Sequence, residues 1–288
     1  MTRRAALLGA ALLAAPAFAQ ARPVGVVAAE SVYADVARQV AGPGARVTAI
    51  MTNPDQDPHE YEPTPSAARA VADARIVVLN GTGYDPWMRR LVDAVPVSGR
   101  AVIDVARLVH ARGNPHLWYD PQAVLAVAQA LADALGRADP DDAAGYAQRA
   151  RAFAQSLAPL QARVAAMRAR WHGAPVAATE PVFGLMAEAL GLRMLDEPFQ
   201  LAVMNGTEPP ASEVAAFERN LRTHQARVLI TNRQTTDAAV QRLLRIAAEA
   251  GVPIVGVTET EPAGESYAQW MLSQLGALDA ALARGPAS

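Results

Sequence analysis

The sequence predicts an α/β protein of two lobes, each with a mostly parallel sheet flanked by helices, joined by a long spine helix. Short apolar runs of strand type alternate with amphipathic helical segments along nearly the whole chain, and this order is typical of parallel sheets covered on both faces. One long periodic segment, residues 141–172, interrupts the alternation near the middle. A chain of 288 residues, 51% of them hydrophobic, is long enough for two ordinary domains.

The first 19 residues are typical of a signal peptide that is removed on export. Residues 2–4 carry two arginines, residues 5–15 form an apolar run too short to span a bilayer comfortably, and Ala17-Phe18-Ala19 fits a cleavage site. We therefore expect cleavage after Ala19 and a periplasmic location; the alternative is a membrane anchor. Because the sequence has no cysteine, we expect no lipid attachment, disulfide or thiolate metal site.

Residues 20–140 are expected to form the N-terminal lobe. Thr64 has the place of a helix N-cap, because Pro65 follows it and proline is favoured at the first helical position. Gly136 is expected to end the helix that leads into the spine segment. The predicted strands are residues 24–28, 46–51, 76–79 and 101–103, and the predicted helices are residues 31–41, 87–94, 121–135 and one beginning at Pro65.

Residues 141–172 are expected to link the lobes. Apolar side chains recur in this segment at spacings of three, four and seven, as on one face of a helix. They are Tyr146, Phe153, Leu157, Leu160, Val164, Met167 and Trp171. One helix of this span would be about 45 Å long, which exceeds the diameter of a small domain. Pro159 should kink the helix or break it in two. The alternative to a spine is two ordinary helices.

Residues 173–288 are expected to form the C-terminal lobe, where strands and helices alternate again. Ser212 is expected to cap one helix, and Gly251 to end another. The predicted strands are residues 175–178, 228–231 and 254–257. The predicted helices are one after Pro181 that ends at Leu190, the one capped by Ser212, and residues 236–250 and 266–282.

Acidic or imidazole side chains occur in four strand-to-helix loops. They are His59, His116, Glu180, and one of Glu259 or Glu261. Because ligands of open α/β sheets gather at the carboxyl ends of the strands, these groups are candidates for a single site. Neighbouring prolines stiffen the two histidine loops. Two neutral imidazoles and two carboxylates balance the charge of a divalent cation, and this set of nitrogen and oxygen ligands suits Zn²⁺, Mn²⁺ or Fe²⁺.

Each of these residues also has an ordinary alternative role. His59 and His116 can be loop histidines beside proline, and Glu180 can be the favourable negative charge at a helix N-terminus. Glu259 and Glu261 can be solvated loop carboxylates. The remaining histidines lie near helix ends or in polar surroundings, and we expect all three on the surface: His110, His172 and His224.

Three motifs resemble one known family. They are Asp57-Pro58-His59-Glu60-Tyr61-Glu62-Pro63, Asn80-Gly81, and Pro115-His116-Leu117-Trp118-Tyr119-Asp120-Pro121. Essentially the whole mature chain is similar to the cluster A-I solute-binding proteins, the metal-binding proteins of bacterial zinc and manganese ABC importers. The resemblance implies two α/β lobes, a rigid connecting helix, and one divalent ion in the cleft between the lobes, with ligands from both.

The family pattern implies ligand roles residue by residue. His59 and His116 match the two histidines of the N-terminal lobe. Glu180 falls where zinc-binding members often carry histidine and manganese-binding members often carry glutamate. The fourth ligand of the family is usually an aspartate after the last strand, where this sequence has none. Simple counting places Glu261 opposite that aspartate, whereas a shorter loop would place Glu259 in the site, and we prefer Glu259. Zinc and manganese or iron stay open as alternatives.

The resemblance implies capture of an ion and no catalysis. We therefore expect a periplasmic monomer, free of the membrane after cleavage, that binds one metal ion with high affinity and delivers it to the membrane permease of a metal ABC importer. A net charge of −2 without a basic stripe argues against a nucleic-acid partner. One alternative is a periplasmic binding protein for an organic solute or a metal chelate. A less favoured alternative is a zinc-dependent hydrolase, for which we find no H-E-x-x-H motif.

Overall fold

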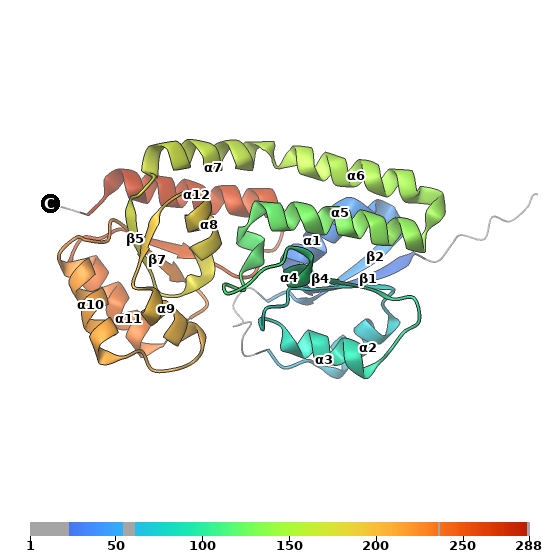
Figure 1. The fold of residues 1–288 in the computed structure, drawn as a ribbon, viewed down its shortest axis with the longest axis horizontal. Coiled ribbons are helices and arrows are strands. Elements are labelled where there is room, and N and C mark those ends of the chain that lie inside the picture. Colours follow the sequence, from blue (N-terminus) through green and yellow to red (C-terminus); the bar gives the residue numbers. More distant parts are fainter. Residues whose placement is uncertain (1–22, 54–60, 236, 287–288) are drawn as a thin grey trace, which may run out of the picture.

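The chain forms two α/β lobes that lie side by side in the computed structural model (Figure 1). The structure describes residues 23–53, 61–235 and 237–286. His59 and the predicted signal peptide lie outside these ranges. Each lobe contains one four-stranded sheet, and every strand pair in both sheets is parallel. The predicted α/β class, with two parallel-sheet lobes, is therefore confirmed.

The two sheets share one topology. The N-terminal sheet has the strand order β2-β1-β3-β4, and the C-terminal sheet has the corresponding order β6-β5-β7-β8. The strands are β1 (Val24–Glu30), β2 (Ala45–Met51), β3 (Ile76–Leu79), β4 (Ala101–Asp104), β5 (Pro175–Ala178), β6 (Arg193–Leu195), β7 (Leu229–Asn232) and β8 (Ile254–Val257). Because all strands of a parallel sheet end at the same edge, each lobe presents its strand-to-helix loops together.

The N-terminal sheet is buried on both faces. Its helices are α1 (Ser31–Ala41), α2 (Pro65–Asp73), α3 (Pro86–Ala94), α4 (Val105–Leu108) and α5 (Pro121–Ala138). In β1, Val26 and Ala28 belong to the core beneath α1 and α5, whereas Val27 and Ala29 belong to the core beneath α2 and α3. Successive strand residues point to opposite faces, so a strand covered on both faces must be apolar at every position.

Two sequence predictions about this lobe have opposite outcomes. Thr64 caps α2, since its hydroxyl oxygen accepts a hydrogen bond from the Ala67 backbone N–H at 3.2 Å. Gly136 does not end α5, and that prediction is wrong, because the helix continues to Ala138. A Cβ on Gly136 would lie 3.2 Å from the Cβ of Ala143. The glycine therefore serves the close approach of the following helix, and Pro140 marks the turn.

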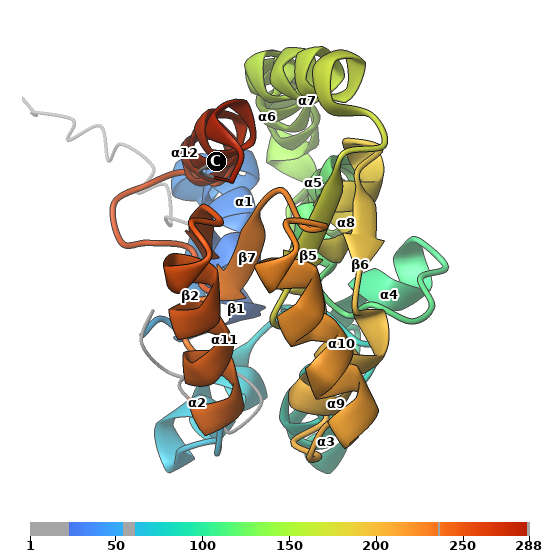
Figure 2. The ribbon, with the colours of Figure 1, turned by 90° about the vertical axis from the view of Figure 1, so that its left-hand side faces the viewer.

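Residues 143–171 form two helices in line, α6 (Ala143–Ser156) and α7 (Ala158–Trp171). They meet at Leu157, as expected from Pro159, which lacks a backbone N–H and sits in the first turn of α7. Helix α6 packs on α1 and α5 of the N-terminal lobe, and α7 packs on α12 (Tyr267–Arg284) of the C-terminal lobe. Figure 2 shows α6, α7 and α12 together on one side of both lobes, away from α2, α3 and α11.

The C-terminal lobe contains α8 (Gly184–Ala189), α9 (Glu197–Met204), α10 (Ala211–Arg222), α11 (Ala238–Glu249) and α12. Ser212 lies inside α10, whose N-cap is Pro210, so the predicted serine cap is wrong. Strand β6 and helix α9 are absent from the sequence prediction. The strand has three residues, none fully buried, and α9 is short with few buried residues, so neither produces a clear hydrophobic period.

One continuous hydrophobic core extends through both lobes. It joins residues of β1, α1 and α5 to residues of β5, α8 and α12. Tyr119 stands at the junction, with its ring centroid 5.2 Å from that of Phe183 and 5.9 Å from that of Trp270. Its hydroxyl donates to the backbone oxygen of Thr258 at 2.7 Å. In the part of the chain that the structure describes, no helix is long and apolar enough to cross a membrane.

The shared core predicts a single cooperative unfolding transition. Phe183→Ala should lower the free energy of unfolding by about 3–5 kcal/mol, because it removes a buried ring that both lobes contact. Urea titrations followed by circular dichroism and by tryptophan fluorescence should coincide for the wild type. Val97→Ala, at a position that is 36% exposed, is the control and should change little. Two separate transitions would contradict the shared core.

Candidate metal site

His116, Glu180 and Glu259 meet between the lobes. His116 stands between α4 and the single-turn 3-10 helix η3 (Leu117–Tyr119), Glu180 follows β5, and Glu259 follows β8. All three side chains are buried, with exposed fractions of 0%, 5% and 2% in that order. The Nε2 atom of His116 is 3.3 Å from Oε2 of Glu259. Groups 143 positions apart in sequence, counted from 259 − 116, therefore converge on one point.

Asn232, the last residue of β7, holds the two carboxylates together. Its Nδ2 atom donates to Oε1 of Glu259 at 2.7 Å and to Oε2 of Glu180 at 2.9 Å. The Thr235 hydroxyl donates to the other oxygen of Glu180, and the Tyr84 hydroxyl donates to Oε2 of Glu259 at 2.9 Å. Buried carboxylates need such donors, because an unpaired buried charge is costly.

The electrostatics of this cluster favour a cation. Burial raises the pKa of Glu180, and the nearby Glu259 carboxylate raises it further, while hydrogen bonds from Thr235 and Asn232 oppose the shift. Burial also raises the pKa of Tyr84, and Glu259 adds to that effect. Both shifts reflect excess negative charge in a dry environment, which a positive ion would relieve.

Aromatic rings and the side chain of Asn80 hold His116 and its loop in place. Its ring stands edge-on to Tyr84 and Trp118, with centroid distances of 5.8 and 5.5 Å. Asn80 donates from Nδ2 to the Pro115 backbone oxygen at 2.7 Å and accepts from the Tyr33 hydroxyl at 2.6 Å. The Asn80-Gly81 end of β3 therefore anchors the histidine loop.

The two candidates for the fourth ligand lie in different places. Glu259 contacts His116, whereas the Glu261 backbone N–H donates to Ser31 Oγ at 3.1 Å and its side chain lies near Asp35 of α1. Burial raises the pKa of Glu261 to about 9, and Asp35 adds to the shift. Only Glu259 joins the cluster with His116 and Glu180.

Sequence reasoning missed Asn232, Thr235 and Tyr84. Asn232 was detectable in principle, because it is a polar residue at the end of the buried strand Leu229–Asn232. Within the described ranges, no three His, Asp or Glu side chains are spaced closely enough to form a metal site by themselves. His59, the remaining predicted ligand, lies outside those ranges. The other three histidines, His110, His172 and His224, are all exposed, as expected.

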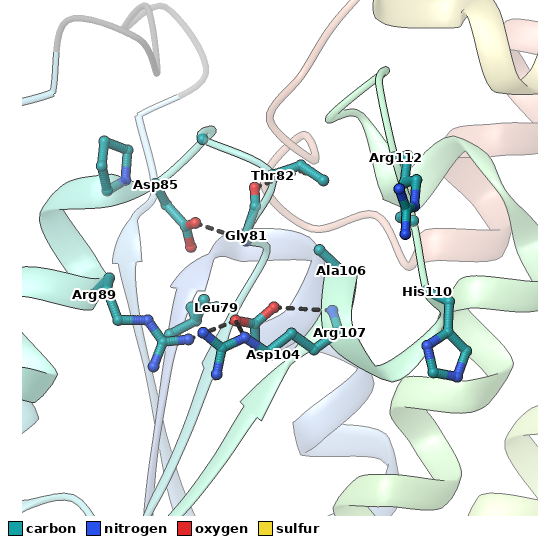
Figure 3. Close-up of a pocket in the computed structure, with 13 residues that line it drawn as sticks. Leu79, Gly81, Thr82, Asp85, Arg89, Asp104, Ala106, Arg107, His110 and Arg112 are labelled. Carbon is teal, nitrogen blue, oxygen red and sulfur yellow. Dashed lines mark hydrogen bonds and ion pairs between the residues drawn. The ribbon is translucent and has the colours of Figure 1, made fainter.

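A separate cavity of about 470 Å³ lies beside the ends of β3 and β4 (Figure 3). Three arginines, Arg89, Arg107 and Arg112, line it. Asp104 is paired with Arg89 at 2.5 Å and with Arg107 at 3.3 Å. None of the candidate ligands lines this cavity.

Residues 26–281 match the family model described as "ZnuA: Zinc-uptake complex component A periplasmic". The chain belongs to this family. The chain is 37% identical over 143 residues to the manganese-binding lipoprotein MntA of Halalkalibacterium halodurans, covering 47% of each chain. It is 28% identical over 182 residues to the iron-binding protein YfeA of Yersinia pestis, covering 58% of this chain and 57% of that protein. The chain thus spans about half the length of these curated relatives.

Solved structures share the fold over nearly the whole chain. The periplasmic zinc-binding protein TroA of Treponema pallidum superposes with a TM-score of 0.77 at 20% identity, covering 91% of this chain and 99% of TroA. FpvC of Pseudomonas aeruginosa, solved in complex with Mn²⁺, gives a TM-score of 0.76 at 22% identity over 91% of this chain and 99% of FpvC. These matches support the two-lobe architecture.

A second buried carboxyl pair lies at the base of the histidine loop. Asp85 accepts hydrogen bonds from the backbone N–H groups of Asn80 and Gly81 at 2.7 and 2.8 Å. Burial raises the pKa of Glu30 well above its ordinary 4.5, and the adjacent Asp85 carboxyl raises it further. Tyr33 and Tyr84 are the other titratable groups that interact with Glu30. The folded protein therefore favours the protonated form of Glu30 more strongly than the unfolded chain does.

This pair predicts a pH-dependent stability. Because the pKa of Glu30 is raised in the folded state, its contribution is complete below pH 4.5 and is lost as the pH rises towards the folded-state pKa. Glu30→Gln keeps a neutral donor facing Asp85, so it should remove this loss and raise stability at pH 8. Urea unfolding between pH 5 and pH 9 measures the effect. Identical pH slopes in wild type and variant would rule out the protonated pair.

Proposed function

We propose that the protein captures one divalent transition-metal ion, Zn²⁺ or Mn²⁺ with Fe²⁺ as a further candidate, and delivers it to the permease of an ABC importer. The observation that supports this most is the buried cluster of His116, Glu180 and Glu259, drawn from both lobes. The neutral Asn232 amide stabilises both carboxylates by hydrogen bonds but leaves their negative charge in place. A bound cation would neutralise that charge.

In this proposal His59 completes the ligand set. Two neutral imidazoles and two carboxylates form a neutral complex with a divalent ion. Residues 20–140 and 173–288 act as the two halves of the site, and the segment 141–172 acts as the spine between them. The family description names a periplasmic uptake component, and this supports export. Our proposal adds cleavage after Ala19 and handover to a membrane permease by a monomer.

The identity of the ion is left open by the ligand types. Carboxylate oxygens of Glu180 and Glu259 favour harder ions such as Mn²⁺, whereas Zn²⁺ binds more tightly than Mn²⁺ to most nitrogen and oxygen sites. Relatives are named for manganese and for iron, and a structural neighbour is named for zinc. The proposed role is binding without catalysis, which agrees with a family described as a zinc-uptake component.

Glutamate variants at positions 259 and 261 test the site as a matched pair. Glu259→Gln should weaken Zn²⁺ and Mn²⁺ binding by more than about 100-fold, because it removes an anionic ligand. Glu261→Gln should stay within about tenfold of wild type, since burial raises the pKa of Glu261 to about 9 and its side chain lies near Asp35, away from the cluster. Competition titration with a chromophoric chelator measures both affinities.

Elemental analysis of the purified mature protein gives the stoichiometry. We expect about one equivalent of metal in wild type and none in His59→Ala or His116→Ala. Equal loss of binding in both glutamate variants would contradict the assignment of Glu259. If neither ion binds to wild type at any loading, the protein has another ligand, such as an organic solute or a metal chelate.

A further inference from the structure

The side chain of Asn114 makes hydrogen bonds to both lobes. It lies in the loop between α4 and η3, two residues before His116. Its Oδ1 atom accepts from the His116 backbone N–H at 3.0 Å and lies 2.7 Å from the ring Nδ1. Its Nδ2 atom donates to the Pro181 backbone oxygen at 2.6 Å, next to Glu180 in the opposite lobe. Figure 1 shows the segment between α4 and α5 reaching towards the C-terminal lobe.

These partners determine which end of the amide is oxygen. The Pro181 carbonyl can only accept a hydrogen bond, so the amide nitrogen must face it. The His116 backbone N–H can only donate, so the amide oxygen must face His116. An amide oxygen cannot donate, and therefore Nδ1 of the neutral imidazole carries the hydrogen. The lone pair of His116 is then on Nε2, the atom directed at Glu259.

Gly184 makes room for this contact. A Cβ at position 184 would lie 2.6 Å from Nδ2 of Asn114. The backbone at Gly184 is ordinary right-handed helix, with φ −57° and ψ −46°, so no strain requires glycine there. Alanine is the better helix former by about 1 kcal/mol. The glycine at the start of α8 is thus explained by the Asn114 amide.

We propose that Asn114 is a positioning residue that ties the metal ligand His116 to the Glu180 loop of the opposite lobe. The inference rests on the proposed metal-binding function. The oxygen of Asn114 fixes the tautomer and the direction of the imidazole, and its nitrogen holds Pro181. When the lobes separate at this point, the hydrogen bond from the Asn114 side chain to the Pro181 backbone oxygen must break. The side chain that orients the ligand therefore also slows release of the ion.

Three substitutions separate the two roles. Asn114→Asp has the same shape and keeps an acceptor for His116, but it loses the donor to Pro181. Gly184→Ala leaves Asn114 intact and pushes its amide away from Pro181. Asn114→Leu removes both interactions. Asn205→Asp, on the exposed end of α9, and Gly276→Ala, where a Cβ meets nothing within 4 Å, are the matched controls.

The test is the rate at which Zn²⁺-loaded protein releases its ion to excess chelator, measured beside the equilibrium affinity. Asn114→Asp and Gly184→Ala should release Zn²⁺ about tenfold faster, as expected for loss of one hydrogen bond. Their affinities should stay within about tenfold of wild type, and the double variant should release no faster than either single variant, because both break the same bond. Asn114→Leu should also lose affinity by about 10–100-fold, as for other partners of metal-ligating histidines.

Release at the wild-type rate from both Asn114→Asp and Gly184→Ala would overturn the tie between the lobes. An affinity of Asn114→Asp as low as that of Asn114→Leu would overturn the orienting role, because the aspartate keeps the acceptor. Absence of Zn²⁺ binding in wild type would instead refute the proposed function. In that case amide hydrogen exchange still tests the contact between the lobes. Asn114→Asp and Gly184→Ala should each raise exchange in residues 111–117 and 180–186 together, and unchanged exchange there would refute the contact.

Discussion

The structure depends on a buried cluster of like charge between two lobes. Glu180 and Glu259 share the single amide nitrogen of Asn232, and the imidazole of His116 stands against Glu259. Carboxylates in a dry environment are tolerated only when donors or cations face them. The hydrogen bonds from Tyr84 and Thr235 supply part of this compensation. The negative charge that these donors leave is what a divalent ion would neutralise in the proposed function.

The topology of the two sheets brings the side chains of the cluster together. Both sheets are parallel and have corresponding strand orders, so each lobe offers its strand ends at one edge. The core is continuous through Tyr119 and Phe183, and α6, α7 and α12 lie along one side of both lobes. A protein built this way has little room for a wide hinge motion. Local movement of the loops that carry His116 and Glu180 is the simpler route for an ion to enter or leave.

Much of this architecture could be predicted because strong local signals and global packing agree. Strands buried on both faces read as apolar runs, and the Thr64-Pro65 pair marks the start of α2. The prediction that Gly136 ends a helix was wrong, because the glycine serves close packing against Ala143 and not a helix end. Short elements such as β6 bury too little to leave a pattern.

The site could be predicted only in part. Glu180 and Glu259 stand out as ionisable groups just after strands, but the choice between Glu259 and Glu261 depends on the path of a loop that spacing does not define. Asn232 is a neutral amide 27 positions before Glu259, and nothing in the sequence places the two in contact. The pairing of Asn114 with Pro181 depends on how two lobes meet, which local sequence does not encode.

The most direct test of the account is a crystal structure of the Zn²⁺- or Mn²⁺-loaded protein, with anomalous scattering to locate the ion. We expect one ion bonded at about 2.0–2.3 Å to Nε2 of His116 and to carboxylate oxygens of Glu180 and Glu259. An ion bound through Nδ1 of His116, or one held by Glu261 and Asp35 away from Glu180, would contradict the central claim.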